Sequence, residues 1–213
     1  MNTDDLIGAL AAGVRPTPPG SAMRWLVLAM ALGGAAALVG VLAVLGPRAD
    51  LPQAVATGAF WIKAAYTAAL AFCGLFVLHR LSRPGASAGW AWLTLAAVTL
   101  VVFALASAEL MQAAPHARTR MVMGHSAMLC PGRILAFATP VYAALVWAFR
   151  NLAPTRLALA GFAGGLVSGA VGATAYGLAC TEHTAAFLAV WYTIGVLAAG
   201  AVGALLGPRL LRW

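Results

Sequence analysis

Two cysteines, Cys130 and Cys180, are the residues best suited to chemistry in this sequence, because each lies where a long apolar segment meets a loop. The predicted topology places both at the same, outer face of a membrane. Disulfides form and persist outside a bacterial inner membrane, and two thiols can be joined when their Cα atoms lie about 4.4–6.8 Å apart. Redox chemistry is therefore the first interpretation of these two residues.

Metal binding is the second interpretation. Thiolates select soft metals, and His125, Glu182 and His183 are near the cysteines in the sequence as auxiliary ligands. Cys180 and His183 would share a helix face if a helix continued through them. The chain has neither a Cys-x-x-Cys nor a His-x-x-x-His sequence, so the spacing alone is weak evidence. A static structural disulfide, or two unrelated buried thiols, stays open.

Other polar and aromatic residues near the predicted membrane edge have two interpretations each. Glu109 and Glu182 are either functional, as acids near hydrocarbon often are, or salt-bridged to arginines of the outer loops. Trp191 and Tyr192 either belong to an interfacial aromatic belt or shield Cys180.

Motifs for catalysis are missing. The sequence has no nucleotide-binding loop, no Gly-x-Ser-x-Gly and no pair of acids at catalytic spacing. No acid lies deep within an apolar segment, so the chain has no obvious proton relay or cation path. The sequence therefore indicates a protein that is not an enzyme and that needs no cofactor.

The composition indicates a lipid environment. Of 213 residues, 63% are hydrophobic and only 8% are charged, whereas a soluble domain carries roughly 25% charged residues. The net charge of +8 comes from basic residues scattered singly at segment ends. This scatter argues against direct nucleic-acid binding and favours membrane orientation signals.

Six apolar segments are long enough to cross a bilayer as helices, which takes about 20 residues each. A spanning segment must satisfy its own backbone hydrogen bonds, so helices are expected rather than open strands. The predicted fold is all-α: a polytopic domain of six transmembrane helices over residues 25–213. The expected helices are 25–45, 60–78, 90–108, 131–149, 157–179 and 185–206.

The basic residues predict the orientation of these helices. With both chain ends on one side, eight of the thirteen basic residues lie there and five lie opposite, and basic loops tend to stay in the cytoplasm. Both termini are therefore predicted to be cytoplasmic, in a bacterial inner membrane. The terminal side carries Arg15, Arg24, Arg80, Arg83, Arg150, Arg156, Arg209 and Arg212, and the other side carries Arg48, Lys63, Arg118, Arg120 and Arg133.

Small residues recur at every fourth position in the last two predicted helices. Residues four apart share a helix face, and small ones allow membrane helices to approach closely. We therefore expect these two helices to pack tightly, with each other as the first candidate partners. The stripes are Gly161, Gly165, Gly169, Ala173 and Gly177, and then Gly195, Ala199, Gly203 and Gly207.

Residues 1–24 form a predicted cytoplasmic tail with two parts. The first is a short helix, in which early acidic residues complement the helix dipole and Leu6, Ile7 and Leu10 line one face at helical spacing. The second is a stiff proline-rich spacer over residues 15–20. An amphipathic helix on a spacer fits a partner's groove or a membrane surface.

Several motifs along the whole chain carry a resemblance to a known family, and the segment from the second cysteine to the following Trp-Tyr is the most specific. They are Asp5-Leu6-Ile7, Cys130-Pro131, Leu152-Ala153-Pro154, Cys180-Thr181-Glu182 and Trp191-Tyr192. With them the chain resembles the NrsF-type family (negative regulator of sigma F), which are small six-helix membrane anti-sigma factors of proteobacteria.

The resemblance implies a regulator that sequesters an extracytoplasmic-function sigma factor at the inner membrane and releases it when oxidants or heavy metals reach the periplasm. It implies that Cys130 and Cys180 are the sensing pair. We expect Leu6, Ile7 and Leu10 to contact the sigma factor. The expected partners are this sigma factor and the lipid bilayer, and the sequence leaves open whether the chain forms a homodimer.

A small-solute or ion transporter of the inner membrane is the main alternative, although it would need polar groups in mid-membrane and the sequence has few. A thiol oxidoreductase acting with quinone would usually carry a Cys-x-x-Cys pair, which is missing. A purely structural subunit would need neither Cys130 nor Cys180.

Overall fold

The computed structural model describes residues 2–12, 20–83, 88–150, 152 and 154–212, and the regular structure of these residues is entirely helical. The proline-rich spacer predicted over residues 15–20 lies outside them except for Gly20. Three helices are short, namely α1 (Thr3–Ala12), α3 (Leu51–Val55) and α6 (Pro115–Met123). The long helices are α2 (Ser21–Val44), α4 (Gly58–Leu81), α5 (Gly89–Gln112), α7 (Cys130–Phe149), α8 (Leu157–Tyr176) and a composite last helix of α9 (Ala185–Phe187), the π-helical turn η1 (Leu188–Tyr192) and α10 (Thr193–Leu210).

The predicted all-α fold is confirmed, because six helical segments of 20 to 26 residues are long and apolar enough to cross a membrane. Every predicted boundary lies within four residues of the observed one. The last helix continues through Pro208 to Leu210, because a proline in the final turn removes only one backbone hydrogen bond. The predicted fifth helix ends early, at Tyr176, and residues 177–179 form a turn.

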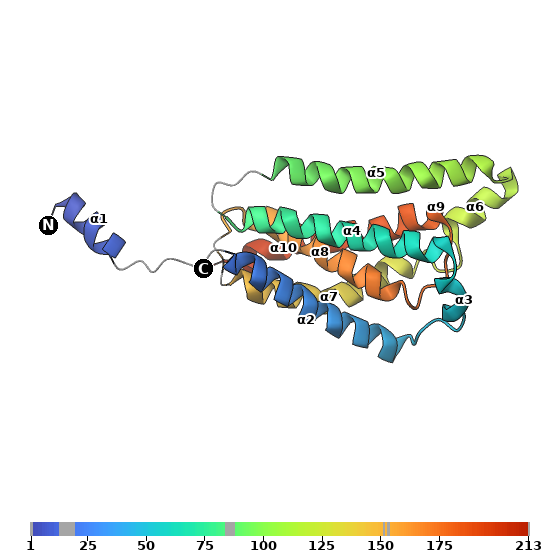
Figure 1. Cartoon of the computed structure of the whole chain (residues 1–213), viewed down its shortest axis with the longest axis horizontal. Helices are drawn as coiled ribbons and strands as arrows, with labels where there is room; N and C mark the ends of the chain where they lie inside the picture. Colours follow the sequence, from blue (N-terminus) through green and yellow to red (C-terminus); the bar gives the residue numbers. More distant parts are fainter. Residues whose placement is uncertain (1, 13–19, 84–87, 151, 153, 213) are drawn as a thin grey trace.

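The long helices run side by side and form a bundle with two distinct ends (Figure 1). The start of α2 and the end of α10 lie at one end, which we call the terminal end. Helices α3, α6 and α9 lie at the opposite end (Figure 1). We call this opposite end the cysteine end, because Cys130 begins α7 there and Cys180 precedes α9.

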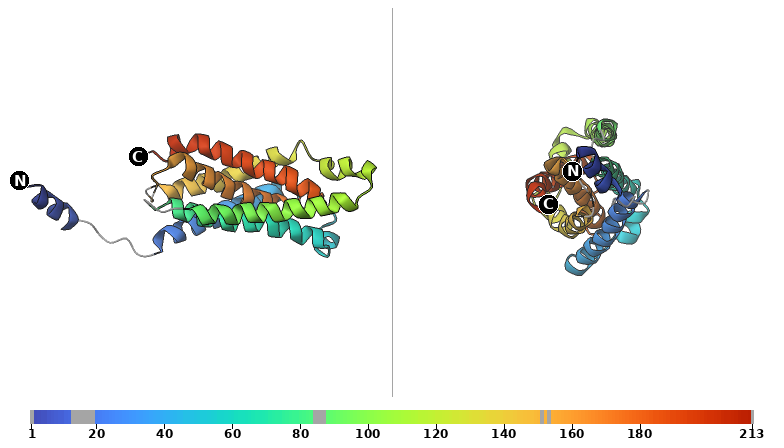
Figure 2. Two further views of the ribbon diagram at one scale, coloured as in Figure 1. Left: turned by 90° about the horizontal axis from the view of Figure 1, so that it is seen from above. Right: turned by 90° about the vertical axis from the view of Figure 1, so that its left-hand side faces the viewer.

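Helix α8 is the centre of the bundle. It contacts α2, α4, α7 and α10, and most of its residues are buried. Helix α5, in contrast, lies at the rim of the bundle (Figure 2). The buried residues of α5 are Ala91, Leu95, Val102 and Ala106.

The predicted tight packing of the last two helices is confirmed at the contact between α8 and α10. A Cβ added at Gly161 would overlap the carbonyl oxygen of Gly203, and one added at Gly165 would overlap that of Ala199. A Cβ on Gly169 would lie 3.0 Å from Val196 Cα. The backbones of these helices therefore touch directly. We call this contact between α8 and α10 the glycine seam.

Two members of the predicted stripes lie elsewhere. An added Cβ at Gly195 would lie 2.9 Å from Ile134 Cδ1, so this residue faces α7 and not α8. Gly177 follows the end of α8, where its nearest neighbour from another element is the Lys63 side chain. The four-residue spacing therefore extends beyond the part of the helices that forms the seam.

Candidate functional site

Residues 180–184 form a stretch without regular secondary structure that joins the turn after α8 to α9. We call this stretch the Cys180 segment. Its first residue is tied to the end of α8, because the Cys180 N–H donates to the Tyr176 carbonyl at 3.0 Å. A backbone outside helices leaves its other polar groups without helical hydrogen bonds, and burial requires other partners for them. Side chains from several distant elements supply those partners.

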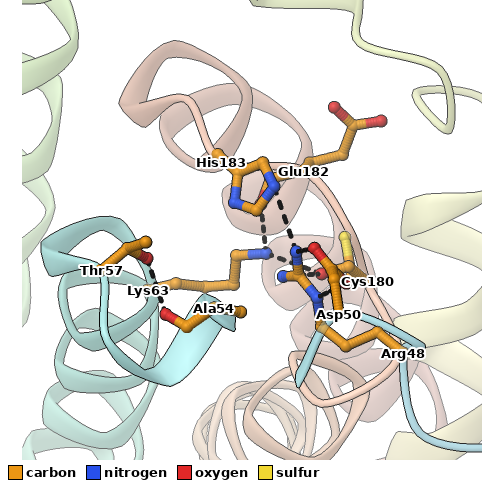
Figure 3. Close-up of polar contacts among 8 residues, drawn as sticks. All are labelled: Arg48, Asp50, Ala54, Thr57, Lys63, Cys180, Glu182 and His183. Carbon is orange, nitrogen blue, oxygen red and sulfur yellow. Dashed lines mark hydrogen bonds and ion pairs between the residues drawn. The ribbon is translucent and has the colours of Figure 1, made fainter. Parts of the chain in front are cut away.

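Two buried cations converge on the Cys180 carbonyl (Figure 3). Arg48, from the connection between α2 and α3, donates through Nη1 at 3.1 Å. Lys63, on α4, donates through Nζ at 3.2 Å to the same oxygen and at 2.5 Å to the Glu182 carbonyl. The exposed fractions of Arg48 and Lys63 are only 5% and 6%. The two side chains therefore clamp the backbone of the Cys180 segment.

Arg48 also makes an ion pair. Its Nη2 and Nε lie 2.6 and 2.7 Å from the two carboxylate oxygens of Asp50, which is a two-pronged arrangement. The hydrogen bond with Asp50 raises the pKa of Arg48 above its ordinary value. The same bond lowers the pKa of the Asp50 carboxyl to about 2. In the described part of the chain, Lys63 has no carboxylate partner of this kind.

His183 faces Arg48 and does not share a helix face with Cys180. Its Nε2 lies 3.1 Å from Arg48 Nη2. A guanidinium only donates hydrogen bonds, so Nε2 accepts and the ring proton is on Nδ1. The common face, expected only if a helix continued through both residues, does not form, because α8 ends at Tyr176 and residues 180–184 are not helical.

Glu182 fastens the Cys180 segment to the turn that precedes α7. Its Oε1 accepts from the backbone N–H groups of His125 and Ser126 at 2.7 and 3.2 Å, and from Ser126 Oγ at 3.2 Å. Gly124 permits this approach, because it has a φ of +53° and an added Cβ would lie 2.5 Å from Glu182 Oε2. The Glu182 carboxylate is therefore a latch between the segments that carry the two cysteines.

Three further bonds close the cysteine end. Thr184 Oγ1 donates to the Met121 carbonyl at 2.7 Å, and Trp191 Nε1 donates to the Val122 carbonyl at 2.9 Å. The Glu109 carboxylate accepts from the Ala186 N–H at 3.1 Å. Among the described residues neither Glu109 nor Glu182 forms an ion pair with an arginine. Of the two interpretations of these acids, the salt bridge is therefore not seen, and both carboxylates bind backbone N–H groups instead.

Both candidate cysteines are buried, Cys130 at 0% and Cys180 at 3% exposure. Cys130 is the first residue of α7, and its N–H donates to the Ser126 carbonyl at 2.9 Å. The three cysteines are free, so no disulfide joins Cys130 to Cys180. Both thiols belong to the buried core of the bundle.

No group of three or more His, Cys, Asp or Glu side chains within the described ranges is placed to hold a metal ion. His125 contributes its backbone N–H to the latch and its side chain is exposed. Glu182 and His183 are engaged by the latch and by Arg48. The predicted auxiliary ligands are therefore near Cys180 in the chain, but in this arrangement their polar atoms have other partners.

Tyr192 forms an aromatic wall beside the thiols. It is fully buried in the π-helical turn, with its ring centroid 6.1 Å from that of Tyr176 and 6.4 Å from that of Phe187. Within the described chain its hydroxyl has no hydrogen-bond partner. Burial rules out the interfacial-belt role for Tyr192 and fits the shielding role.

The remaining predicted site residues are on α1. This helix has no buried residue. The exposed fractions of its apolar side chains are 43% for Leu6, 59% for Ile7 and 65% for Leu10. Three large apolar side chains on one short helix are thus available to a partner.

Sequence reasoning missed the cation clamp and Gly124. Arg48 and Lys63 were interpreted only as orientation signals. One signal was present, because Lys63 is the single lysine of the chain and lies inside an apolar segment, where charged residues usually have a specific role. Nothing in the sequence distinguishes Gly124 from the other glycines, of which the chain has 23 in all.

Comparison with known proteins gives a consistent result over the whole chain. A family model described as "Negative regulator of sigma F" (NrsF) matches residues 10–213. The chain is 48% identical over 222 aligned positions to the anti-sigma-F factor NrsF of Caulobacter vibrioides, with both chains fully covered. It is 42% identical to a probable anti-sigma-F factor NrsF of Azospira oryzae, again over the full length of both. No solved structure gives a significant match.

Proposed function

Because this chain belongs to the family of negative regulators of sigma F (NrsF), we propose that it holds an extracytoplasmic-function sigma factor inactive at a bacterial inner membrane. The observation that carries this proposal is the 48% and 42% identity to two anti-sigma-F factors over the complete chain. The family consists of regulators, and the chain is accordingly not an enzyme.

The proposed orientation has both termini in the cytoplasm and the cysteine end in the periplasm. Two observations support it. The start of α2 and the end of α10 lie at the same end of the bundle (Figure 1). Eight of the thirteen basic residues belong to that end or to the tail, as expected for the cytoplasmic side.

The proposed contact with the sigma factor is the exposed face of α1. Leu6, Ile7 and Leu10 are 43–65% exposed, and burying a large apolar side chain contributes roughly 1.5–3 kcal/mol. An amphipathic helix of this kind fits a groove on a partner protein. The tail would then be the effector of the regulator.

The proposed sensor is the thiol pair Cys130 and Cys180. A two-electron oxidant would join them as a disulfide, taking two electrons and two protons from the thiols. A soft divalent metal would instead displace both thiol protons and bind the two thiolates. The support is that both thiols are free, buried and at the same end of the bundle.

Either reaction would disturb the bonds of the Cys180 segment. Cys180 is clamped by Arg48 and Lys63 through its carbonyl, and the segments of the two cysteines are latched by Glu182. A change at the thiols would therefore move α7 relative to α8. Release of the partner follows if the two arrangements differ in partner affinity by a few kcal/mol.

The transporter alternative has less support. The hydroxyls of Thr67 and Ser168, buried in α4 and α8, donate to carbonyls of their own helices, and Lys63 is held by the Cys180 segment. These groups are satisfied locally and do not line a polar path.

The tail is tested by replacing Leu6, Ile7 and Leu10 together with alanine. We expect the sigma factor to move from the membrane to the soluble fraction and its target promoters to become active, while the regulator stays in the membrane. The matched control replaces three leucines of the bundle that are 68–73% exposed, Leu93, Leu100 and Leu205, with alanine. Normal repression by the tail variant would contradict the proposed contact.

A further inference from the structure

A cavity of about 270 Å³ opens at the terminal end of the bundle. It lies where α7 and α10 end, and three arginines contribute to its wall. Its lining residues are Phe149, Arg150, Arg209, Leu210, Leu211 and Arg212. Phe149 and Leu211 are buried, with exposed fractions of 3% and 6%. The cavity therefore combines a basic rim with an apolar floor.

The arginines of this cavity are available for binding. Arg150, Arg209 and Arg212 are exposed, and within the described residues no ion pair involves them. Each guanidinium offers five N–H donors in a planar fork, which matches the two oxygens of a carboxylate. Three such forks around one cavity form a concave site for acidic side chains.

Among the side chains that the structure describes, the bundle offers no acid to these arginines. The chain has five acidic residues. Asp50, Glu109 and Glu182 belong to the cysteine end, where Asp50 binds Arg48 and the two glutamates bind backbone N–H groups. Asp4 and Asp5 are on α1, in the tail. Within the described residues the arginines of the cavity face no acidic side chain, and only the dipoles of the two helix ends oppose their charge.

The two helices that frame the cavity also reach the thiols. Helix α7 begins at Cys130 and ends beside Arg150, and α10 follows the π-helical turn with Tyr192 and carries Arg209. The helices are joined halfway, where Tyr142 Oη donates to the Gly203 carbonyl at 3.0 Å. A shift of α7 relative to α10 at the cysteine end would change the spacing of Arg150 and Arg209.

From these observations we propose that the arginine-lined cavity is a second docking surface for the sigma factor, and that it binds a short segment of that protein with acidic side chains beside an apolar one. The proposal rests on the proposed function. It adds a contact whose geometry depends directly on α7 and α10, whereas the tail is attached only through α2.

The test is binding of the purified full-length chain, in nanodiscs of uncharged phosphatidylcholine, to the sigma factor that the wild-type chain retains in the tail experiment. The cavity variant is Arg150→Gln with Arg209→Gln. The matched control is Arg24→Gln with Arg156→Gln, which removes the same charge from exposed positions at the same end but outside the cavity. Retention in the membrane and the thermal unfolding midpoint establish that both variants are folded.

We expect the cavity variant to bind at least tenfold more weakly, with a smaller dependence on salt concentration, and the control to stay within twofold of wild type. Arg150→Lys with Arg209→Lys should recover only part of the affinity, because an ammonium lacks the planar fork.

If both variants lost the same affinity for the sigma factor, the loss would follow from the total positive charge and not from the cavity, and the proposal would be overturned. Full affinity of the cavity variant would also overturn it, and an effect that appears only with anionic lipid would assign the arginines to lipid headgroups. In all three cases the tail variant would still lose binding, so the proposed function would survive. Absence of binding by the wild-type chain would instead refute the proposed function.

Discussion

The glycine seam and the cysteine end hold the same molecule together in different ways. In the seam, the backbones of α8 and α10 touch directly at Gly161, Gly165 and Gly203. At the cysteine end, segments outside regular helices are held in place by individual side-chain hydrogen bonds, such as those from Lys63 and Glu182. The contacting atoms of the seam belong to the backbone, which cannot change rotamer. The side-chain hydrogen bonds of the cysteine end can break and form again with other partners.

This difference indicates where the protein can change. A close-packed contact transmits displacement and has few alternative arrangements, so α8 and α10 are expected to move as one body. Hydrogen bonds contribute about 0.5–1.5 kcal/mol each, and those to charged groups about 1.5–3 kcal/mol. Rearrangement is therefore cheapest at the cysteine end, where the free thiols lie.

The largest expected effect comes from breaking the seam. Gly165→Leu would force a side chain into the Ala199 carbonyl, and because backbone cannot yield as side chains do, we expect more than about 3 kcal/mol of destabilisation. The amount of folded protein in membranes measures it. Gly89→Leu is the control, since a Cβ there meets nothing within 4 Å. Normal accumulation of the Gly165 variant would show that the seam is not close-packed.

Loss of the latch should have the next largest effect. Glu182→Ala leaves two backbone N–H groups and one hydroxyl without their acceptor, which we expect to cost about 1.5–3 kcal/mol. The variant should still fold, but Cys130 and Cys180 should react faster with an alkylating reagent. Glu109→Ala serves as the comparison because it removes the acceptor of only one N–H. Unchanged thiol reactivity would show that the Glu182 bonds do not control access to the thiols.

Removing the lysine of the clamp should change accessibility more than stability. Lys63→Met deletes two bonds to carbonyls but also removes a buried charge that has no carboxylate partner in the described chain. Because these effects oppose each other, we expect stability to stay within about 1 kcal/mol and Cys180 alkylation to rise several-fold. Lys63→Arg should lie between wild type and methionine. A large loss of stability with no change in alkylation would contradict this assignment.

The smallest effect concerns the ion pair beside the clamp. Arg48 lowers the pKa of the Asp50 carboxyl to about 2, from an ordinary 3.8. A lowered carboxyl pKa stabilises the folded state above the ordinary value, and that stabilisation disappears as pH falls from there through about 2. Asp50→Asn should therefore lose less stability than wild type between pH 4 and 2. Parallel unfolding midpoints for the two proteins over this range would contradict the prediction.

The seam shows what the sequence could predict. Glycine and alanine recur at every fourth position in two apolar segments. Residues four apart lie on one face of a helix, and small residues on one face allow another helix to approach closely, so the spacing predicts both the helices and their contact. The six spans follow from length and hydropathy in the same way. The identity of the contacting face was less certain, and Gly195 indeed faces Ile134 on another helix.

The cysteine end shows what the sequence could not predict. Its bonds join residues far apart in the sequence, in the case of Lys63 and Cys180 by more than a hundred positions, and the carbonyl that accepts there carries no side-chain signature. Glu182 likewise binds backbone N–H groups, which any residue type except proline would offer. The cysteines were identifiable as candidates, but their shared burial depends on this non-local bonding.

The central claim is that Cys130 and Cys180 control release of a sigma factor held at the terminal end. The most direct measurement is the fraction of that sigma factor bound to membranes in cells before and after brief exposure to hydrogen peroxide or cadmium. We predict that wild type and Cys73→Ser lose the bound sigma factor on exposure, whereas Cys130→Ser with Cys180→Ser retains it. Release from the double variant as complete as from wild type would contradict the account.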